Sequence, residues 1–378
     1  MRSDKDKAIY MRKLATDFAF AMRMIGSFDK SYICVDSYSW RKDFDMGIPQ
    51  TGVAITGYKA NRVKDDEDPV ICWESFKEVN NDFIQLLEKY GNANIRVSGA
   101  EADDLMFLVS KELFAMGEDC IIVTLDSDIS QLVKFNDKNF ICCFNTKSTS
   151  RQVVGAPGFE EWLVERMQQH TDVDPIAAML NSDLSQGSVE TVHALIQQTN
   201  LIEVDPEAVV FNKVVCGDMG DNIPAIATWE TTQKSGKVVN SRITESKAAT
   251  IKEMILDKGN GIEIHDLERY AKIFVRGLKQ IYNRDFPEEI LQERLSRNTF
   301  LVLLSEYTIP QSIVTKFHEV YNIEKYGTKP SQESLSMQAL LEGTKYYEDR
   351  GTFSIDIFKD ADDSDIPETK ILTKKKLF

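Results

Sequence analysis

Short apolar runs alternate with amphipathic stretches along the first part of the chain. Residues 76–90 and 103–114 place apolar side chains at helical spacing. Four other runs have the length and composition of buried strands: 32–36, 94–98, 120–124 and 140–144. This alternation predicts an α/β fold with a parallel-type central sheet and flanking helices.

The pattern changes at about residue 211. Strand-like runs become scarce and helical spacing dominates to about residue 325. The end of the chain is different again, because residues 360–368 hold five acids and are followed by three consecutive lysines. We predict an α/β domain over residues 1–210, a helical lobe over 211–345 and a flexible tail over 346–378.

The composition is that of a soluble globular enzyme, which we expect in the cytoplasm. Of 378 residues, 42% are hydrophobic and 28% are charged. No apolar run approaches the roughly 20 residues of a membrane-spanning helix, and the N-terminus lacks the apolar segment of a secretory signal. Six cysteines without C-x-x-C spacing predict buried thiols, and four scattered histidines form no H-E-x-x-H pattern.

The charge is unevenly distributed. The net charge of −15 argues against a nucleic-acid partner. However, residues 1–64 hold twelve basic against seven acidic residues, and residues 231–252 hold five basic residues against one acidic residue. These segments are either local basic patches for a polyanion or solvated faces, and charge alone does not decide between them.

Three acidic stretches hold the candidate chemistry: SGAEADDL (98–105), TLDSDISQL (124–132) and GDMGDNIP (217–224). Each places carboxylates two or three residues apart at the edge of a predicted element, where cations are needed to neutralise them. The first two stretches follow predicted strands, and ligands of open α/β sheets bind beyond the carboxyl ends of strands. The three stretches therefore predict a magnesium site.

The first stretch also has a purely structural interpretation. Ser98 and Glu101 fit a capping box at the start of a helix. Asp103 and Asp104 would then be ordinary first-turn acids that the helix dipole favours.

The other two stretches have structural interpretations as well. Asp126 and Asp128 fit a capped turn between a strand and a helix. Asp218 and Asp221 fit either two acids on one helical face or a turn. It is less expected that all three stretches are merely structural.

The three stretches resemble, in the same order, the acidic motifs of the flap endonuclease, or 5′-nuclease, family. Upstream, ICVDSYSWRKDF (33–44) and GYKANR (57–62) resemble the family's second strand and the start of its helical gateway. NTFLVLLSEYTIP (298–310) resembles the C-terminal region of the phage ribonuclease H branch, the most similar branch. The resemblance runs from about residue 31 to about 325 and is interrupted by an apparent helical insertion near 155–205. It implies a PIN-like nuclease domain followed by a helix-three-turn-helix lobe.

The resemblance implies roles for individual residues. Lys59 and Arg62 match the basic gateway residues that contact the scissile phosphate, although an exposed basic helix face is the alternative. The implied metal ligands are Asp36, Glu101, Asp103, Asp104, Asp126, Asp128, Asp218 and Asp221. The expected nucleic-acid contacts are Arg41, Lys42, Lys234, Lys237, Arg242, Ser246 and Lys247.

Two features depart from the family pattern. The stretch WETTQKSGKVVNSRITESKAA (229–249) is longer and poorer in glycine than the family's helix-three-turn-helix turn. The family also begins with a strand that carries its first metal-binding Asp, whereas this chain starts in the following helix, and Asp4, Asp6 and Asp17 lie on no apolar strand. We expect that strand to be missing, through a late assigned start, a split gene or genuine loss.

The resemblance implies a hydrolase of the 5′-3′ exonuclease, flap endonuclease or ribonuclease H type. Such an enzyme removes RNA primers or 5′ flaps during DNA replication, using two Mg²⁺ ions about 3.5–4 Å apart, with Mn²⁺ as a substitute. Two other interpretations stay open. One is a DNA-binding protein that is catalytically impaired by the missing Asp, and the other is a phosphatase-like or endoribonuclease enzyme at the same sheet edge.

The resemblance also implies partners. We expect branched DNA or an RNA–DNA duplex with a 5′ end, bound through phosphates and therefore sensitive to salt. A single-strand binding protein or a sliding clamp is a further expected partner, the clamp through the terminal KKKLF, unless that end is only disordered. The protein is expected to be a monomer without membrane contact, in the host cytoplasm if a phage encodes it.

Overall fold

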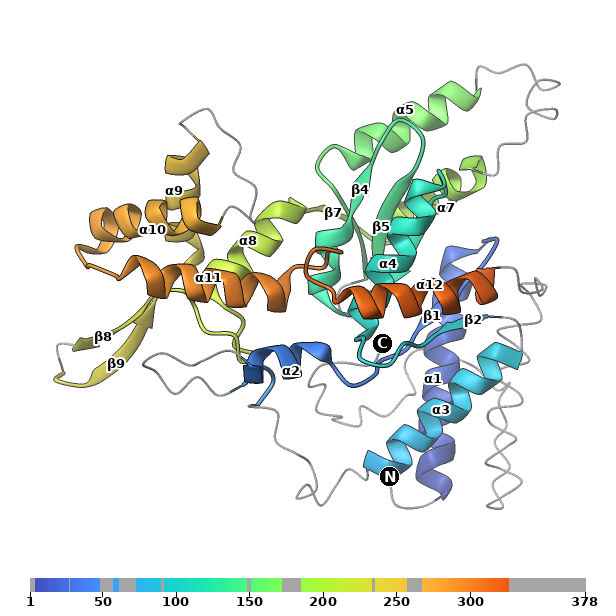
Figure 1. The fold of residues 1–378 in the computed structure, drawn as a ribbon. Helices are drawn as coiled ribbons and strands as arrows, with labels where there is room; N and C mark the ends of the chain where they lie inside the picture. The colour runs from blue at the N-terminus through green and yellow to red at the C-terminus, as the bar shows by residue number, and fades with distance from the viewer. Residues whose placement is uncertain are drawn as a thin grey trace.

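A computed structural model describes most of the chain as an α/β fold with a helical lobe beside it (Figure 1). The predicted α/β class is confirmed. The predicted tail, Arg62 and Lys234 lie outside the described residues. The structure describes residues 4–26, 28–47, 57–60, 73–89, 92–147, 151–171, 185–232, 235–256 and 267–325.

Two strands form a short parallel pair near the N-terminal helices. β1 (Tyr32–Cys34) pairs with β2 (Ala93–Ile95), and Cys34 lies opposite Ile95. Beside this pair, helices α1 and α3 pack on each other through buried side chains that include Met11 and Phe83. The helices of this part are α1 (Asp4–Ile25), α2 (Trp40–Gly47), α3 (Trp73–Lys89) and α4 (Ala102–Ala115).

The larger sheet is mixed. Its strand order is β3-β5-β6-β7, with β4 paired to β5. β3 runs parallel to β5 and β6 parallel to β7, whereas the β5–β6 and β4–β5 pairs are antiparallel. The strands are β3 (Cys120–Val123), β4 (Lys134–Phe135), β5 (Phe140–Asn145), β6 (Gln152–Gly155) and β7 (Leu201–Glu203).

The four predicted strands are present as β1, β2, β3 and β5, and the two predicted helices are α3 and α4. The predicted strands pair in parallel, β1 with β2 and β3 with β5, whereas β6, which was not predicted, adds an antiparallel pair. Only residues 146–151 join β5 to β6, and a parallel pair needs a crossover of about a dozen residues or more. The two strands therefore run antiparallel.

The predicted insertion near 155–205 belongs to the core of this sheet. Phe159 and Leu163 of α5 (Phe159–Thr171) and Val192 of α7 (Ser185–Gln198) pack into the same buried cluster as Phe140 and Phe144. This region also supplies β7 to the sheet. Residues 172–184 of the predicted insertion lie outside the described residues.

The helical lobe has its own core. Buried side chains of α8 (Pro206–Cys216), including Phe211 and Val214, pack against Phe274 and Leu295 from later helices. The other elements of this lobe are β8 (Thr228–Thr232), β9 (Val238–Arg242), α9 (Glu245–Leu256), α10 (Leu267–Tyr282) and α11 (Glu288–Val302).

The antiparallel hairpin β8–β9 was not predicted. It occupies the segment where the resemblance implied a helix-three-turn-helix turn. Both strands alternate exposed and half-buried residues, so no apolar run marks them in the sequence. The half-buried Trp229 packs on Tyr282, with ring centroids 4.6 Å apart.

The last described helix returns to the first part of the chain. α12 (Gln311–Lys325) packs with Ile313, Phe317 and Tyr321 against the core around Ile95 and Leu105. The predicted boundary at residue 211 assigns α12 to the helical lobe, whereas its packing joins it to the α/β part. The chain therefore crosses between the two parts twice.

No helix among the described residues is long and apolar enough to cross a membrane. The five described cysteines are free thiols. Cys142, Cys143 and Cys216 are buried, as predicted, whereas Cys34 and Cys120 are half-buried, and Cys72 lies outside the described part. Burial raises the pKa of Cys216 to about 11, so this thiol stays protonated at neutral pH.

Gly217 ends α8 in a position that only glycine fits. Its φ is +74°, and a Cβ there would lie 2.6 Å from the Ala225 nitrogen and the Pro224 carbonyl carbon. We predict that Gly217→Ala lowers the free energy of unfolding by about 3–5 kcal/mol, measured by urea denaturation.

Gly236 in the β8–β9 turn is the matched control. Its φ is +80°, but a Cβ would meet nothing within 4 Å. Gly236→Ala should therefore cost only the backbone term of about 1 kcal/mol. Equal losses in the two variants would show that the close contacts at Gly217 do not matter.

Candidate functional site

The start of α4 brings together the strand-end Asp36 and the first acidic stretch. Glu101 is the N-cap of α4, and its backbone N–H donates to the Asp104 carboxylate at 3.1 Å. Asp36 accepts a hydrogen bond from the Ala102 N–H at 2.8 Å. The capping interpretation was right in kind but wrong in place, because the helix begins after Glu101 and not after Ser98.

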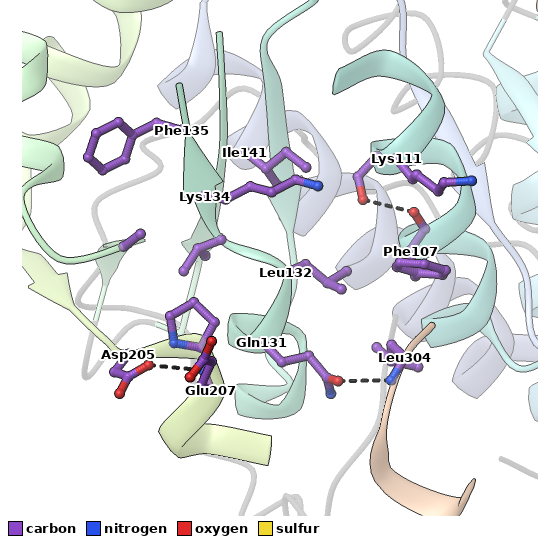
Figure 2. Close-up of a pocket in the computed structure, with 14 residues that line it drawn as sticks. Phe107, Lys111, Gln131, Leu132, Lys134, Phe135, Ile141, Asp205, Glu207 and Leu304 are labelled. Atoms are coloured by element: carbon purple, nitrogen blue, oxygen red, sulfur yellow. Dashed lines mark hydrogen bonds between the residues drawn. The ribbon is translucent and has the colours of Figure 1, made fainter. Parts of the chain in front are cut away.

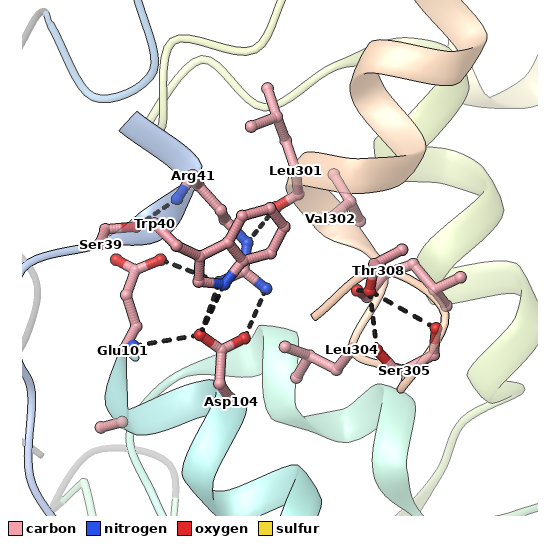
Figure 3. A network of polar contacts seen from close by, with 12 residues as sticks. Ser39, Trp40, Arg41, Glu101, Asp104, Leu301, Val302, Leu304, Ser305 and Thr308 are labelled. Atoms are coloured by element: carbon pink, nitrogen blue, oxygen red, sulfur yellow. Dashed lines mark hydrogen bonds and ion pairs between the residues drawn. The ribbon is translucent and has the colours of Figure 1, made fainter. Parts of the chain in front are cut away.

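Arg41 of α2 binds this group from inside the protein (Figure 3). Its guanidinium donates to both oxygens of Asp104, at 2.8 and 3.0 Å, and to Glu101 at 3.2 Å. Trp40 Nε1 donates to the same Asp104 carboxylate at 3.1 Å. Asp104 is 0% exposed, so its charge is neutralised by Arg41 and not by solvent.

The short turn at residues 57–60 adds a second cation. The Lys59 ammonium pairs with Glu101 and lies 4.0 Å from Asp221. The Tyr58 hydroxyl lies 3.1 Å from Glu101 and 3.3 Å from Asp221, and donates to one of them at a time. Lys59 has a φ of +58°, an unusual backbone conformation that its surroundings must stabilise.

The third acidic stretch forms a turn and not a helix. Asp218 and Ile223 exchange two backbone hydrogen bonds, at 2.9 and 2.8 Å, which closes the turn. The turn docks on residues 57–60, since the Lys59 N–H donates to the Asp221 carbonyl at 2.9 Å and Asn222 Nδ2 donates to the Gly57 carbonyl at 2.9 Å. The helical-face interpretation of Asp218 and Asp221 was therefore wrong, and the turn interpretation is confirmed.

Lys213 connects the second stretch to the third. Its ammonium pairs with Asp128 and lies 2.8 Å from Asp218. Asp126 caps the 3-10 helix η2 (Ser127–Leu132) by accepting from the Asp128 N–H at 3.0 Å. All three acidic stretches thus belong to one network, joined by Arg41, Lys59 and Lys213.

The charges in this network are unevenly compensated. Burial alone would lower the pKa of Lys213, but the charge of Asp128 and hydrogen bonds to Asp128 and Asp218 raise it above its ordinary value. Burial and the neighbouring Asp126 raise the pKa of Asp128, although Lys213 opposes this. Both pKa values are therefore raised. That of Lys213 is raised because two carboxylates share its ammonium, and that of Asp128 because it is buried beside a second acid, Asp126. Burial and the charge of Glu101 raise the pKa of Tyr58, so its hydroxyl stays protonated and can donate.

The predicted site residues differ in exposure. Glu101, Asp104 and Lys59 are buried, Asp36 is exposed, and Asp103, Asp126, Asp128, Asp218 and Asp221 are partly exposed. Among the expected nucleic-acid contacts, Lys42, Lys237, Arg242, Ser246 and Lys247 are exposed. Arg41 is only 2% exposed, so the prediction that it contacts nucleic acid does not fit its position. Its structural role is to hold Asp104 and Glu101.

Sequence reasoning missed several residues of the network: Asp45, Tyr58, Lys213, Arg297 and Asn298. The Asp45 carboxylate binds Arg297 at 2.6 and 3.0 Å and accepts from the Tyr58 N–H at 2.6 Å. Asp45 lies four residues after Arg41 on α2, and charged residues at that spacing on a short helix were the available signal. Lys213 gave no such signal, because an isolated lysine near an apolar run usually marks a helix surface.

The donor chemistry of the site suits a hard divalent cation such as Mg²⁺, which prefers carboxylate oxygens. The described side chains do not form a ready ligand set, however, since no group of three His, Cys, Asp or Glu among them is placed to hold a metal ion. The carboxylates are turned onto Arg41, Lys59 and Lys213 instead. The residues as arranged neutralise themselves.

Figure 2 shows a groove of about 450 Å³. It is lined by residues of α4, η2, β4 and the start of α8, among them Phe107, Gln131, Lys134 and Glu207. None of the predicted site residues lines it. The acidic network therefore stays the candidate site.

Comparison with solved structures gives neighbours at low sequence identity. The bacteriophage T5 flap endonuclease, in a complex with DNA and metal ions, is 17% identical, with a TM-score of 0.43 over 82% of this chain and 91% of that chain. The T5 5′-exonuclease with bound zinc is 19% identical, with a TM-score of 0.43 over 85% of this chain and 91% of that chain. Likeness at this level does not transfer a function. No protein-family model and no curated protein matches the chain.

Removing the Arg41 side chain would leave the buried carboxylate of Asp104 without its cation. We predict that Arg41→Met lowers the free energy of unfolding by about 3–5 kcal/mol, because Asp104 is then buried without a cation. Lys42→Met is the matched control, since Lys42 is the next residue and is exposed. It should change the free energy of unfolding by no more than about 0.5 kcal/mol. Similar losses in both variants would contradict the role of Arg41.

Lys213→Met should lower the free energy of unfolding at pH 7 by about 1–3 kcal/mol, because two carboxylates lose their shared cation. The folded-state pKa of Lys213 lies above its ordinary value of 10.5, so its stabilisation is complete below that pH and is lost as pH rises through the folded pKa. The difference between wild type and variant should therefore shrink above pH 10.5. Unfolding titrations at neutral and alkaline pH test this, with the exposed Lys138→Met as control.

Proposed function

We propose that this chain is a 5′-nuclease that hydrolyses phosphodiester bonds with the help of divalent cations. The observation that supports this most is the convergence of three acidic stretches, more than a hundred residues apart at the extremes, into one network. The same stretches, in the same order, are the ones that resemble the 5′-nuclease motifs. The network brings more carboxylates together than its three basic side chains can neutralise one to one, and divalent cations would balance the remaining charge.

The cation-binding part of the proposal rests on carboxylates with oxygens near solvent. Asp36 is exposed, and Asp126, Asp128, Asp218 and Asp221 are partly exposed. Bound divalent ions would supply Lewis-acid chemistry and an activated water at this site. Asp104 is a poor ligand, since its two oxygens already accept from Arg41, Trp40 and the Glu101 N–H.

The nucleic-acid part of the proposal rests on exposed basic side chains. Lys42 extends from α2, Lys237 and Arg242 from the β8–β9 hairpin, and Lys247 from the start of α9. Such side chains can bind phosphates without reading sequence. We propose that they bind the duplex and that Arg62, Lys234 and Ser246 contribute to the same contact.

The finer assignments are supported by the sequence resemblance alone. We propose that the substrate is branched DNA or an RNA–DNA duplex with a 5′ end, and that the reaction removes primers or flaps during replication. Mg²⁺ is the proposed ion. A monomer in the cytoplasm, with a replication protein as partner, completes the proposal.

The deciding experiment measures cleavage of a 5′-flap and an RNA–DNA substrate with Mg²⁺ or Mn²⁺. Asp126→Asn should lower cleavage by at least about 10²-fold while DNA binding persists. The amide still accepts the Asp128 N–H, so the η2 cap is retained. Chelation with EDTA should abolish cleavage by the wild type.

The matched control is Asp137→Asn, which removes an exposed carboxylate outside the network. It should cleave as the wild type does. Binding without cleavage by the wild type would favour the impaired DNA-binding protein over the nuclease. Preference for unstructured single-stranded RNA would instead favour the endoribonuclease.

A further inference from the structure

The last turns of α11, with Leu304 just after its end, hydrogen-bond to α2, to η2 and to both sides of the 217–224 turn. Arg297 and Asn298 are buried side chains, 5% and 0% exposed. The backbone of Leu301, Val302 and Leu304 makes further contacts. These five residues span less than three helical turns of sequence, yet their partners come from four separate segments.

Arg297 acts on the turn that holds Lys59. It binds the Asp45 carboxylate through two nitrogens, at 2.6 and 3.0 Å. The same carboxylate accepts the Tyr58 N–H at 2.6 Å, directly before Lys59. The Arg297–Asp45 ion pair thus holds the residue directly before Lys59, whose backbone has the unusual φ of +58°.

Asn298, the next residue, acts on the third acidic stretch. Its side-chain amide donates to the Val214 and Pro224 carbonyls, each at 2.8 Å. These carbonyls lie on either side of the turn that carries Asp218 and Asp221. By binding both carbonyls, Asn298 fixes the distance between the two ends of the 217–224 turn.

The last carbonyls of α11 contact the second stretch directly and the first stretch through Arg41. The last four carbonyls of a helix have no partner within the helix. Arg41 Nε donates to the Leu301 carbonyl at 3.1 Å (Figure 3), and Gln131 Nε2 donates to the Val302 carbonyl at 3.3 Å. Gln131 also donates to the Asp128 carbonyl at 3.0 Å and accepts from the Leu304 N–H at 2.9 Å (Figure 2).

We infer that the C-terminal end of α11 is the positioning element of the acidic site, with Arg297 a positioning residue that holds Lys59 through Asp45. This inference rests on the proposed function for its catalytic consequence but not for its structural one. The negative end of the α11 dipole favours Arg41 at this place, which adds an electrostatic reason for the arrangement. One helix end thereby sets the relative positions of residues from four segments.

The first test measures how well Lys59 is held, independently of any activity. Arg297→Gln should raise the acetylation rate of Lys59 by N-hydroxysuccinimide acetate about tenfold. The rate is followed by mass spectrometry of the full chain against the exposed Lys237. Arg294→Gln is the matched control: Arg294 lies one turn earlier on α11 and donates to the Ile226 carbonyl, outside the network. It should leave the Lys59 rate unchanged.

The second test measures catalysis on a 5′-flap substrate with Mg²⁺. Arg297→Gln should lower kcat by about 10²-fold with a smaller change in KM, since a misplaced group affects the reacting geometry more than binding. Arg297→Lys, which keeps the charge but not the two-point contact, should recover part of kcat. A merely structural role would lower the amount of folded enzyme and leave kcat per folded molecule unchanged.

A further variant distinguishes the loss of positioning from the loss of the fold. Asp45→Asn with Arg297→Gln leaves no unpaired buried charge, and it should show the same faster Lys59 acetylation as the single change. Unchanged acetylation in folded variants would overturn the inference, and so would loss of fold in all three Arg297 variants. If the wild type cleaves nothing, the proposed function fails while the acetylation result still decides the positioning role.

Discussion

Arg41 binds Asp104 through two parallel hydrogen bonds in a place that water does not reach. The arrangement of the site depends on this contact, because a buried carboxylate without a cation would destabilise the fold. The guanidinium also reaches Glu101 and the Leu301 carbonyl. It therefore joins the start of α4 to the end of α11, two elements nearly two hundred residues apart in the sequence.

Lys59 and Lys213 extend the same principle to less buried positions. Each ammonium lies between two carboxylates from different stretches, Glu101 and Asp221 for Lys59, and Asp128 and Asp218 for Lys213. A shared cation holds two acids closer than their repulsion would otherwise allow. Three basic side chains thus gather acids that the proposed function would use for divalent ions.

The two parts of the molecule meet at this network. The helical lobe contributes Lys213, the 217–224 turn and the end of α11, while the α/β part contributes α2, α4 and η2. α12 then returns to pack on β2 and α4. Contacts across the two parts fix the site, so a change in their relative placement would separate the acidic stretches.

The sequence by itself determined the four apolar strands, the helices α3 and α4, and the three acidic stretches, because strand and helix periods and clustered charges are local signals. It did not determine the antiparallel β5–β6 pair, which depends on how the short connection reverses the chain. It also did not determine the β8–β9 hairpin, whose strands are only half-buried, or the position of α12, which depends on packing against distant residues. In the site, it identified the acids but not which basic side chains pair with them. Arg41 looked like a phosphate contact and Lys213 gave no signal, since whether a basic side chain faces solvent or a buried carboxylate is decided only when distant segments pack together.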